Sequence, residues 1–170
     1  MLKKIFLIFI IVLVPFVALN AQSKRALKKA EEQAKYEKAK AAIEAKLFVI
    51  VPDVYEKSDG TLETNSDEAN FVLFEEDGFF YLQGSIIAGN KFTNKTEVSE
   101  FDLKIDKKGS VFLKMQVSGS ALTARVEIQM RKGSNYADVI VIPTSGRTLR
   151  FSGEVFPKSE GKYYKRPNVV

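Results

Sequence analysis

Carboxylates, amines, guanidinium groups and hydroxyls are the reactive side chains of this sequence, because it contains neither histidine nor cysteine. Without histidine it lacks the commonest general base and the commonest transition-metal ligand. Without cysteine it can form neither a disulfide nor a thiolate nucleophile. A carboxylate enzyme acting on sugars needs two acids roughly 5 to 9.5 Å apart, and the pattern singles out no such pair among the 21 acidic residues. We therefore expect a protein that is not an enzyme and that uses no metal or other cofactor.

The polar segment 53–69 gathers carboxylates that suggest a calcium site. Beyond Asp53 its acidic residues are Glu56, Asp59, Glu63, Asp67 and Glu68. Their spacing does not match a calcium loop of the D-x-[DN]-x-[DN]-G type. We therefore interpret this segment as a surface loop.

The C-terminal tail, residues 158–170, combines cations with aromatic rings. These residues are Lys162, Tyr163, Tyr164, Lys165 and Arg166. Such a composition can bind polyanions or anionic lipid, but a frayed, solvated terminus is the interpretation that we prefer. Over the whole chain the charge is +5, with 26 Lys and Arg against 21 Asp and Glu, and the cations are scattered. This pattern gives no basic stripe, so we expect no nucleic-acid partner.

The first 21 residues have the three parts of a secretory signal. Lys3 and Lys4 form its positive end, and an apolar run extends from Ile5 to Val17. Small residues then precede a cleavage point after Ala21. The apolar run is shorter than the roughly 20 residues of a spanning helix, which favours cleavage over an uncleaved anchor. We expect an exported protein, periplasmic or extracellular, with no stable membrane span after cleavage.

Residues 22–46 are rich in Ala, Lys and Glu and contain neither Gly nor Pro, which predicts a helix. The apolar stripe that we expect on it is Leu27, Ala30, Ala34, Ala41 and Ala45. Alanine buries little area, so membrane insertion through this stripe would be weak. We expect a solvated helix that packs only its last turns on the following domain.

Residues 47–157 predict a β domain, because apolar and polar side chains alternate over most of its length. The pattern is clearest between Phe101 and Phe156, where short glycine-containing turns separate successive strands. An Asp77-Gly78 pair between two aromatic-rich runs, 70–75 and 79–83, indicates a hairpin. Residues 47–51 predict a first strand that ends at Pro52, and 84–96 predict a loop or bulged crossing. About eight antiparallel strands with short links can close as an up-and-down barrel or stack as a sandwich.

Several segments resemble one known family. They are Ala41-Ala42-Ile43 before Phe48, Tyr81-Leu82-Gln83 before a Gly/Asn loop, Phe101-Asp102-Leu103, Val117-Ser118-Gly119-Ser120, and the ending Thr148-Leu149-Arg150-Phe151-Ser152-Gly153-Glu154-Val155. The family is a domain of unknown function in small exported proteins, typical of Bacteroidetes, and the resemblance covers most of the mature chain. It implies a lipocalin-like (calycin-like) β-barrel preceded by the helix. The family has no established catalytic residues, so the resemblance implies none here.

A binding module is the first function that this barrel suggests. Eight strands enclose an interior that is either filled or holds one small ligand. Phe71, Phe101 and Phe151 are the candidate interior residues for a small apolar or amphipathic ligand. Arg147 is the fourth candidate, because alternation along the last strand puts it on the same face as Phe151. The same rings can instead fill the core.

An interaction or structural protein of the cell envelope is the alternative. It would hold a partner through the helix, the C-terminal tail or an exposed sheet face. Phe112 and Phe156 lie on the polar parity of their strands and indicate an apolar patch.

Overall fold

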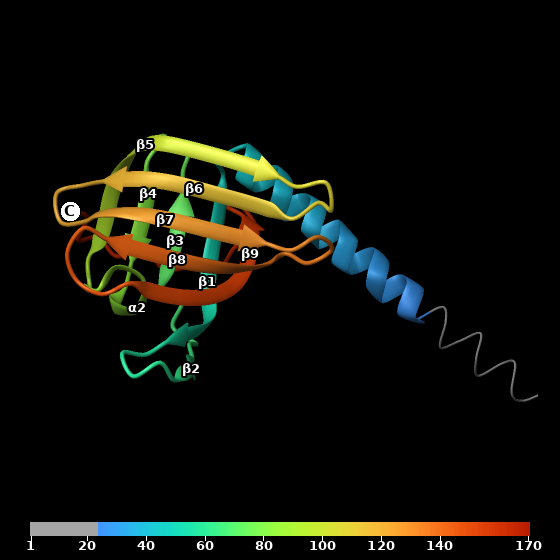
Figure 1. Ribbon diagram of the computed structural model, residues 1–170, viewed down its shortest axis with the longest axis horizontal. Coiled ribbons are helices and arrows are strands. Elements are labelled where there is room, and N and C mark those ends of the chain that lie inside the picture. The colour runs from blue at the N-terminus through green and yellow to red at the C-terminus, as the bar shows by residue number, and fades with distance from the viewer. Residues whose placement is uncertain (1–23) are drawn as a thin grey trace, which may run out of the picture.

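The computed structural model describes residues 24–170, which form an N-terminal helix, nine strands and a second, short helix (Figure 1). The N-terminal helix spans residues 24–44. The other elements are β1 (Phe48–Glu56), β2 (Leu62–Thr64), β3 (Phe71–Phe74), β4 (Phe80–Gln83), α2 (Ser85–Ala88), β5 (Thr93–Ile105), β6 (Val111–Ser118), β7 (Thr123–Met130), β8 (Tyr136–Pro143) and β9 (Leu149–Pro157). The predicted signal segment 1–21 lies outside the described residues. Neither helix of the described part is long and apolar enough to cross a membrane.

Eight of these strands form a closed antiparallel barrel. Their order is β1-β3-β4-β5-β6-β7-β8-β9, and β9 pairs with β1 to close the sheet. β2 is an extra strand that pairs with the end of β1 and projects from the wall as a hairpin (Figure 1). The predicted eight-stranded up-and-down barrel with one N-terminal helix is therefore confirmed.

In β6 to β9 every second side chain points into the barrel, as the alternation of apolar and polar residues predicted. In β6, Val111, Leu113, Met115 and Val117 are buried, and the residues between them face solvent. Phe48, Phe74 and Phe80 fill the interior near the N-terminal helix, with ring centroids 5.8 to 6.3 Å apart. These side chains belong to one continuous core.

The prediction that the first strand ends at Pro52 is wrong. β1 continues to Glu56, because its ladder with β9 shifts register after Pro52 and leaves Asp53 unpaired as a bulge. Gly153, opposite Pro52, makes this close approach possible, since a Cβ there would lie 2.3 Å from the Val51 carbonyl oxygen. The bulge keeps a residue without an N–H donor inside the strand.

Two segments interpreted as loops also contain regular structure. Segment 53–69 holds the end of β1 and all of β2, whose residues are exposed. Segment 84–96 holds α2 and the start of β5. β2 and α2 are both short. β2 has no buried side chain, so no apolar periodicity marks it in the sequence.

The N-terminal helix packs on the barrel through a different face from the predicted stripe. Tyr36, Ala39 and Ile43 are buried, whereas Leu27 is 65% exposed. The hydroxyl of Tyr36 donates a 2.5 Å hydrogen bond to the carbonyl oxygen of Gly109, in the β5–β6 turn. The alanine stripe was wrong because the bulky Tyr and Ile side chains, which bury more area, determine the docked face. Only the later turns are buried, as expected.

Replacing Ile43 with alanine tests which helix face closes the barrel. Ile43 is fully buried, so we expect Ile43→Ala to lower the free energy of unfolding by about 2 to 5 kcal/mol. Leu27→Ala, in the predicted stripe, should change it by less than about 0.5 kcal/mol. Urea unfolding followed by circular dichroism measures both. Equal effects of the two changes would contradict the observed packing.

Candidate functional site at the loop end of the barrel

The two ends of the barrel are closed by different elements. The N-terminal helix covers the end where the β5–β6 and β7–β8 turns lie, which we call the helix end (Figure 1). At the opposite loop end, α2 inserts Ile87 and Ala88 into the core. The β6–β7 and β8–β9 turns extend beyond α2 at this end.

A cleft of about 510 Å³ lies between α2 and these two turns. We call it the loop-end cleft. Its lining residues are Ala88, Gly89, Gly119, Ser120, Ala121, Leu122, Thr123, Pro143, Thr144, Ser145, Gly146, Arg147 and Leu149. The lining thus combines hydroxyl groups, a few apolar side chains and one cation, Arg147.

Hydrogen bonds connect the β8–β9 turn to the start of β7, and β7 to the end of β6. The backbone N–H and the hydroxyl of Thr144 lie 2.9 and 3.3 Å from the carbonyl oxygen of Thr123. The hydroxyls of Thr123 and Ser118 lie 3.2 Å apart. Gly146 has a φ of 99°, a conformation that favours glycine, so the β8–β9 turn depends on this residue.

Other polar side chains of the cleft are free to bind a ligand. Ser120, Ser145 and Arg147 form no side-chain hydrogen bond or ion pair with the rest of residues 24–170. Arg147 is exposed, in a turn before β9 begins at Leu149. A guanidinium group has five N–H donors and is a good ligand for carboxylate or phosphate.

The structure separates the four residues predicted to bind a ligand. Phe151 is buried in the barrel core. Phe101 is half-buried near the helix end, 6.1 Å from the ring of Phe74 and 4.3 Å from the Lys46 ammonium. Arg147 lines the cleft instead of the barrel interior, because it lies in a turn, to which the alternation of β9 does not extend.

The interior placement of Phe71 is wrong. Its ring is fully buried, but on the outer face of the barrel with Val49, Leu73 and Tyr81. β3 is buried on both faces, so its sequence does not show which side chains point inward.

Sequence reasoning missed the hydroxyls Ser120 and Ser145. Both lie in glycine-containing turns, one after β6 and one after β8. Alternate turns of an up-and-down barrel lie at the same end, so the predicted strand order already contained a signal that these turns meet.

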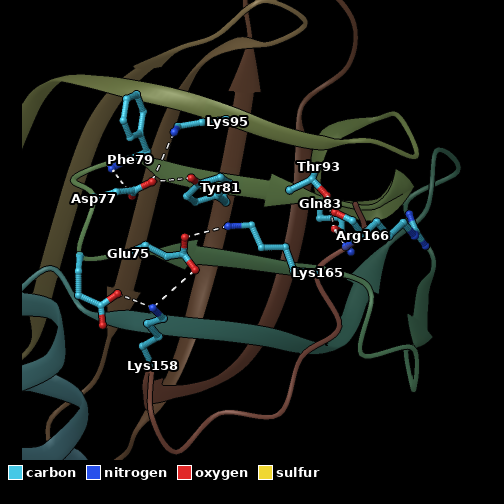
Figure 2. A network of polar contacts seen from close by, with 11 residues as sticks. Glu75, Asp77, Phe79, Tyr81, Gln83, Thr93, Lys95, Lys158, Lys165 and Arg166 are labelled. Carbon is cyan, nitrogen blue, oxygen red and sulfur yellow. Dashed lines mark hydrogen bonds and ion pairs between the residues drawn. The ribbon is translucent and has the colours of Figure 1, made fainter. Parts of the chain in front are cut away.

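A second polar cluster holds the C-terminal tail against the outer face of β3, β4 and β5 (Figure 2). The Lys165 ammonium lies 2.8 Å from a Glu75 carboxylate oxygen and 3.5 Å from the centroid of the Tyr81 ring. Tyr163 packs on Phe71, with ring centroids 5.1 Å apart. The prediction of a frayed tail is wrong, because these contacts cover apolar side chains that would otherwise be exposed.

Gln83 is the central anchor of the tail. Its side-chain amide donates to the carbonyl oxygens of Ala69 and Tyr164, at 2.8 and 2.7 Å. Its amide oxygen accepts from the Thr93 hydroxyl and from the backbone N–H of Arg166. Gln83 is fully buried, and all four of its hydrogen-bonding positions are used.

The end of the tail pairs with the start of β5. The N–H of Thr93 donates to Asn168, and the N–H of Lys95 donates to Val170. β6 ends at Ser118 and leaves this part of β5 without its neighbour. The tail therefore occupies the edge that β6 leaves free, at the loop end.

Removing the Gln83 anchor should loosen the tail. In Gln83→Leu, four hydrogen bonds are lost and buried partners are left unsatisfied, so we expect a loss of roughly 2 to 4 kcal/mol in the free energy of unfolding. Hydrogen exchange should accelerate at the Thr93 and Lys95 amides. The matched change Gln129→Leu, on an exposed position of β7, should affect neither. Unchanged exchange in Gln83→Leu would contradict the anchoring role.

Stability at alkaline pH should depend on Tyr81. Burial, followed by the 2.6 Å hydrogen bond to Asp77, raises the pKa of Tyr81 above the ordinary value of 10.0. Because the folded pKa is raised, this contribution is complete below about pH 10 and disappears as the pH rises towards the folded value. The difference in unfolding free energy between wild type and Tyr81→Phe should therefore shrink above pH 10. Parallel pH profiles would refute this.

Comparisons with known proteins support the barrel and identify the family. Residues 30–155 match the sequence model of "Domain of unknown function (DUF4251)". A crystal structure of a DUF4251 family protein from Bacteroides eggerthii DSM 20697 is similar, with a TM-score of 0.68 and 24% identity over 78% of this chain and 94% of that chain. A search of curated proteins finds no match. Since the family model covers most of its length, the chain belongs to the DUF4251 family.

Proposed function

We propose that this protein is an exported, non-catalytic binding module whose loop-end cleft takes a small amphipathic ligand with an anionic group. The observation that carries this proposal is the position of Arg147, an unpaired cation within the described residues, in a cleft of about 510 Å³. Clefts of roughly 300 to 1,000 Å³ are typical of small-molecule sites.

The lining supports an amphipathic ligand better than a purely apolar one. Ala121 and Pro143 offer apolar surface above the buried Leu122 and Leu149, while Ser120 and Ser145 offer hydroxyls. An anionic group on Arg147 would leave the apolar part of the ligand over Ala121 and Pro143. Binding in the filled core, by contrast, would require Phe151 and its buried neighbours to move.

The non-catalytic part of the proposal rests on the same lining. No carboxylate, lysine or tyrosine is among the described residues that form the cleft. Its serines therefore lack an adjacent general base, which nucleophilic catalysis requires. Export rests on the signal-like residues 1–21.

A cell-envelope partner is the second candidate, favoured by the exposed start of the N-terminal helix. This part of the helix projects away from the barrel (Figure 1), and Leu27, Ala30 and Ala34 are exposed. A truncation designed to remove a partner site must stop before Tyr36, since that side chain belongs to the core.

Native mass spectrometry of the processed protein, gently purified from its exported form, tests ligand binding. We expect an adduct that disappears on denaturation and appears in an organic extract. Arg147→Gln should lower its occupancy about tenfold, because a charged hydrogen bond is lost. Arg131→Gln removes an exposed arginine beyond β7, at the helix end, and should have no effect.

A second pair of variants tests the cleft itself. Ser145→Trp should fill the cleft and abolish the adduct. Ser58→Trp places the same ring in the exposed β1–β2 turn and should leave the adduct unchanged. A clean apo mass in wild type, or an adduct retained by Ser145→Trp, would overturn the proposed site.

A further inference from the structure

The tail presents different residues to the barrel and to solvent. Extended chain directs successive side chains to opposite sides. Tyr163 and Lys165 point inward, onto Phe71 and Glu75. Lys162 and Tyr164, which alternate with them, are exposed, Tyr164 by 60%.

The connection between α2 and β5 extends this outward surface. The Arg166 guanidinium donates a 2.8 Å hydrogen bond to the carbonyl oxygen of Lys91. Phe92, the next residue, is 46% exposed. We call this surface the tail face, formed by Lys91, Phe92, Lys162, Tyr164 and Arg166.

All charged side chains of the tail face are cations. Segments 89–95 and 161–170 contain five cations and no acidic residue. Lys95 and Lys165 form ion pairs with Asp77 and Glu75. The other three cations of these segments belong to the tail face and form no ion pair with any described residue. One acidic residue borders the tail face: the carbonyl oxygen of Glu68, whose side chain is exposed, accepts a hydrogen bond from the backbone N–H of Tyr164. The three cations therefore outnumber the acidic side chains at this surface.

We propose that the tail face docks the protein on an anionic lipid surface. Exposed aromatic rings among cations suit the boundary between headgroups and acyl chains, where Tyr and Phe can enter while Lys and Arg remain near phosphate. Each cation close to such a surface contributes about 1 kcal/mol, or roughly a fivefold change in binding. Three cations and two rings give weak, reversible, salt-sensitive binding. This inference is independent of the ligand proposed for the loop-end cleft.

Vesicle co-sedimentation of the processed protein, with its N-terminus verified by mass, tests the proposal. We expect binding to vesicles of phosphatidylcholine with phosphatidylglycerol, loss of binding at high salt, and little binding to phosphatidylcholine alone. Lys91→Gln with Lys162→Gln should lower the partition coefficient about 25-fold. Lys107→Gln with Lys108→Gln makes the same charge change in the exposed β5–β6 turn, at the helix end, and should lower it much less.

The aromatic residues separate a lipid surface from a soluble polyanion. Phe92→Ser with Tyr164→Ser should weaken vesicle binding at least fivefold while leaving dextran sulfate binding and thermal unfolding unchanged. Equal losses from the two lysine pairs would overturn the proposal, because they would show only a response to net charge. Vesicle binding unaffected by the aromatic changes would also overturn it, in favour of a soluble polyanion.

Discussion

The burial of β3 on both faces is the constraint on which the rest of the structure depends. Two of its four side chains point into the barrel, while Phe71 and Leu73 point outward, and all four are buried. A wall that is apolar on both faces needs a second layer, since an exposed patch of this kind would associate with other molecules. The C-terminal tail supplies that layer, and Gln83 and Glu75 hold it in place. The tail is therefore part of the folded domain rather than an appendage.

The elements that close the two ends of the barrel explain how the loop-end cleft forms. At the helix end, Tyr36 reaches the β5–β6 turn and Ile43 enters the core, so helix and turns pack together. At the loop end, α2 is short and fills the core with Ile87. The turns beyond it have no comparable element to pack on, and the space between them becomes the cleft.

The sequence predicted the strands that have one face exposed to solvent and the other face buried. β6 to β9 alternate cleanly, so their strands and turns followed from periodicity. β3 has no alternation, and Phe71 was therefore placed on the wrong side. Composition identified the tail as basic and aromatic, but the sequence did not predict its contacts with the barrel. Glu75, the partner of Lys165, lies 90 residues away from it along the chain. Arg147 was identified as a candidate, whereas the hydroxyls around it depend on which turns meet.

The position of the tail also relates the two proposed surfaces. Gly89 lines the loop-end cleft, and Lys91, two residues later, belongs to the tail face. The two surfaces therefore meet at the connection between α2 and β5. If the tail face docks on anionic lipid, the cleft is held beside the headgroups of lipids that are themselves amphipathic anions. Docking then raises the effective concentration of such ligands at Arg147 without any new contact in the cleft. A cleft of modest affinity would be sufficient under that condition, because the surface supplies the local concentration.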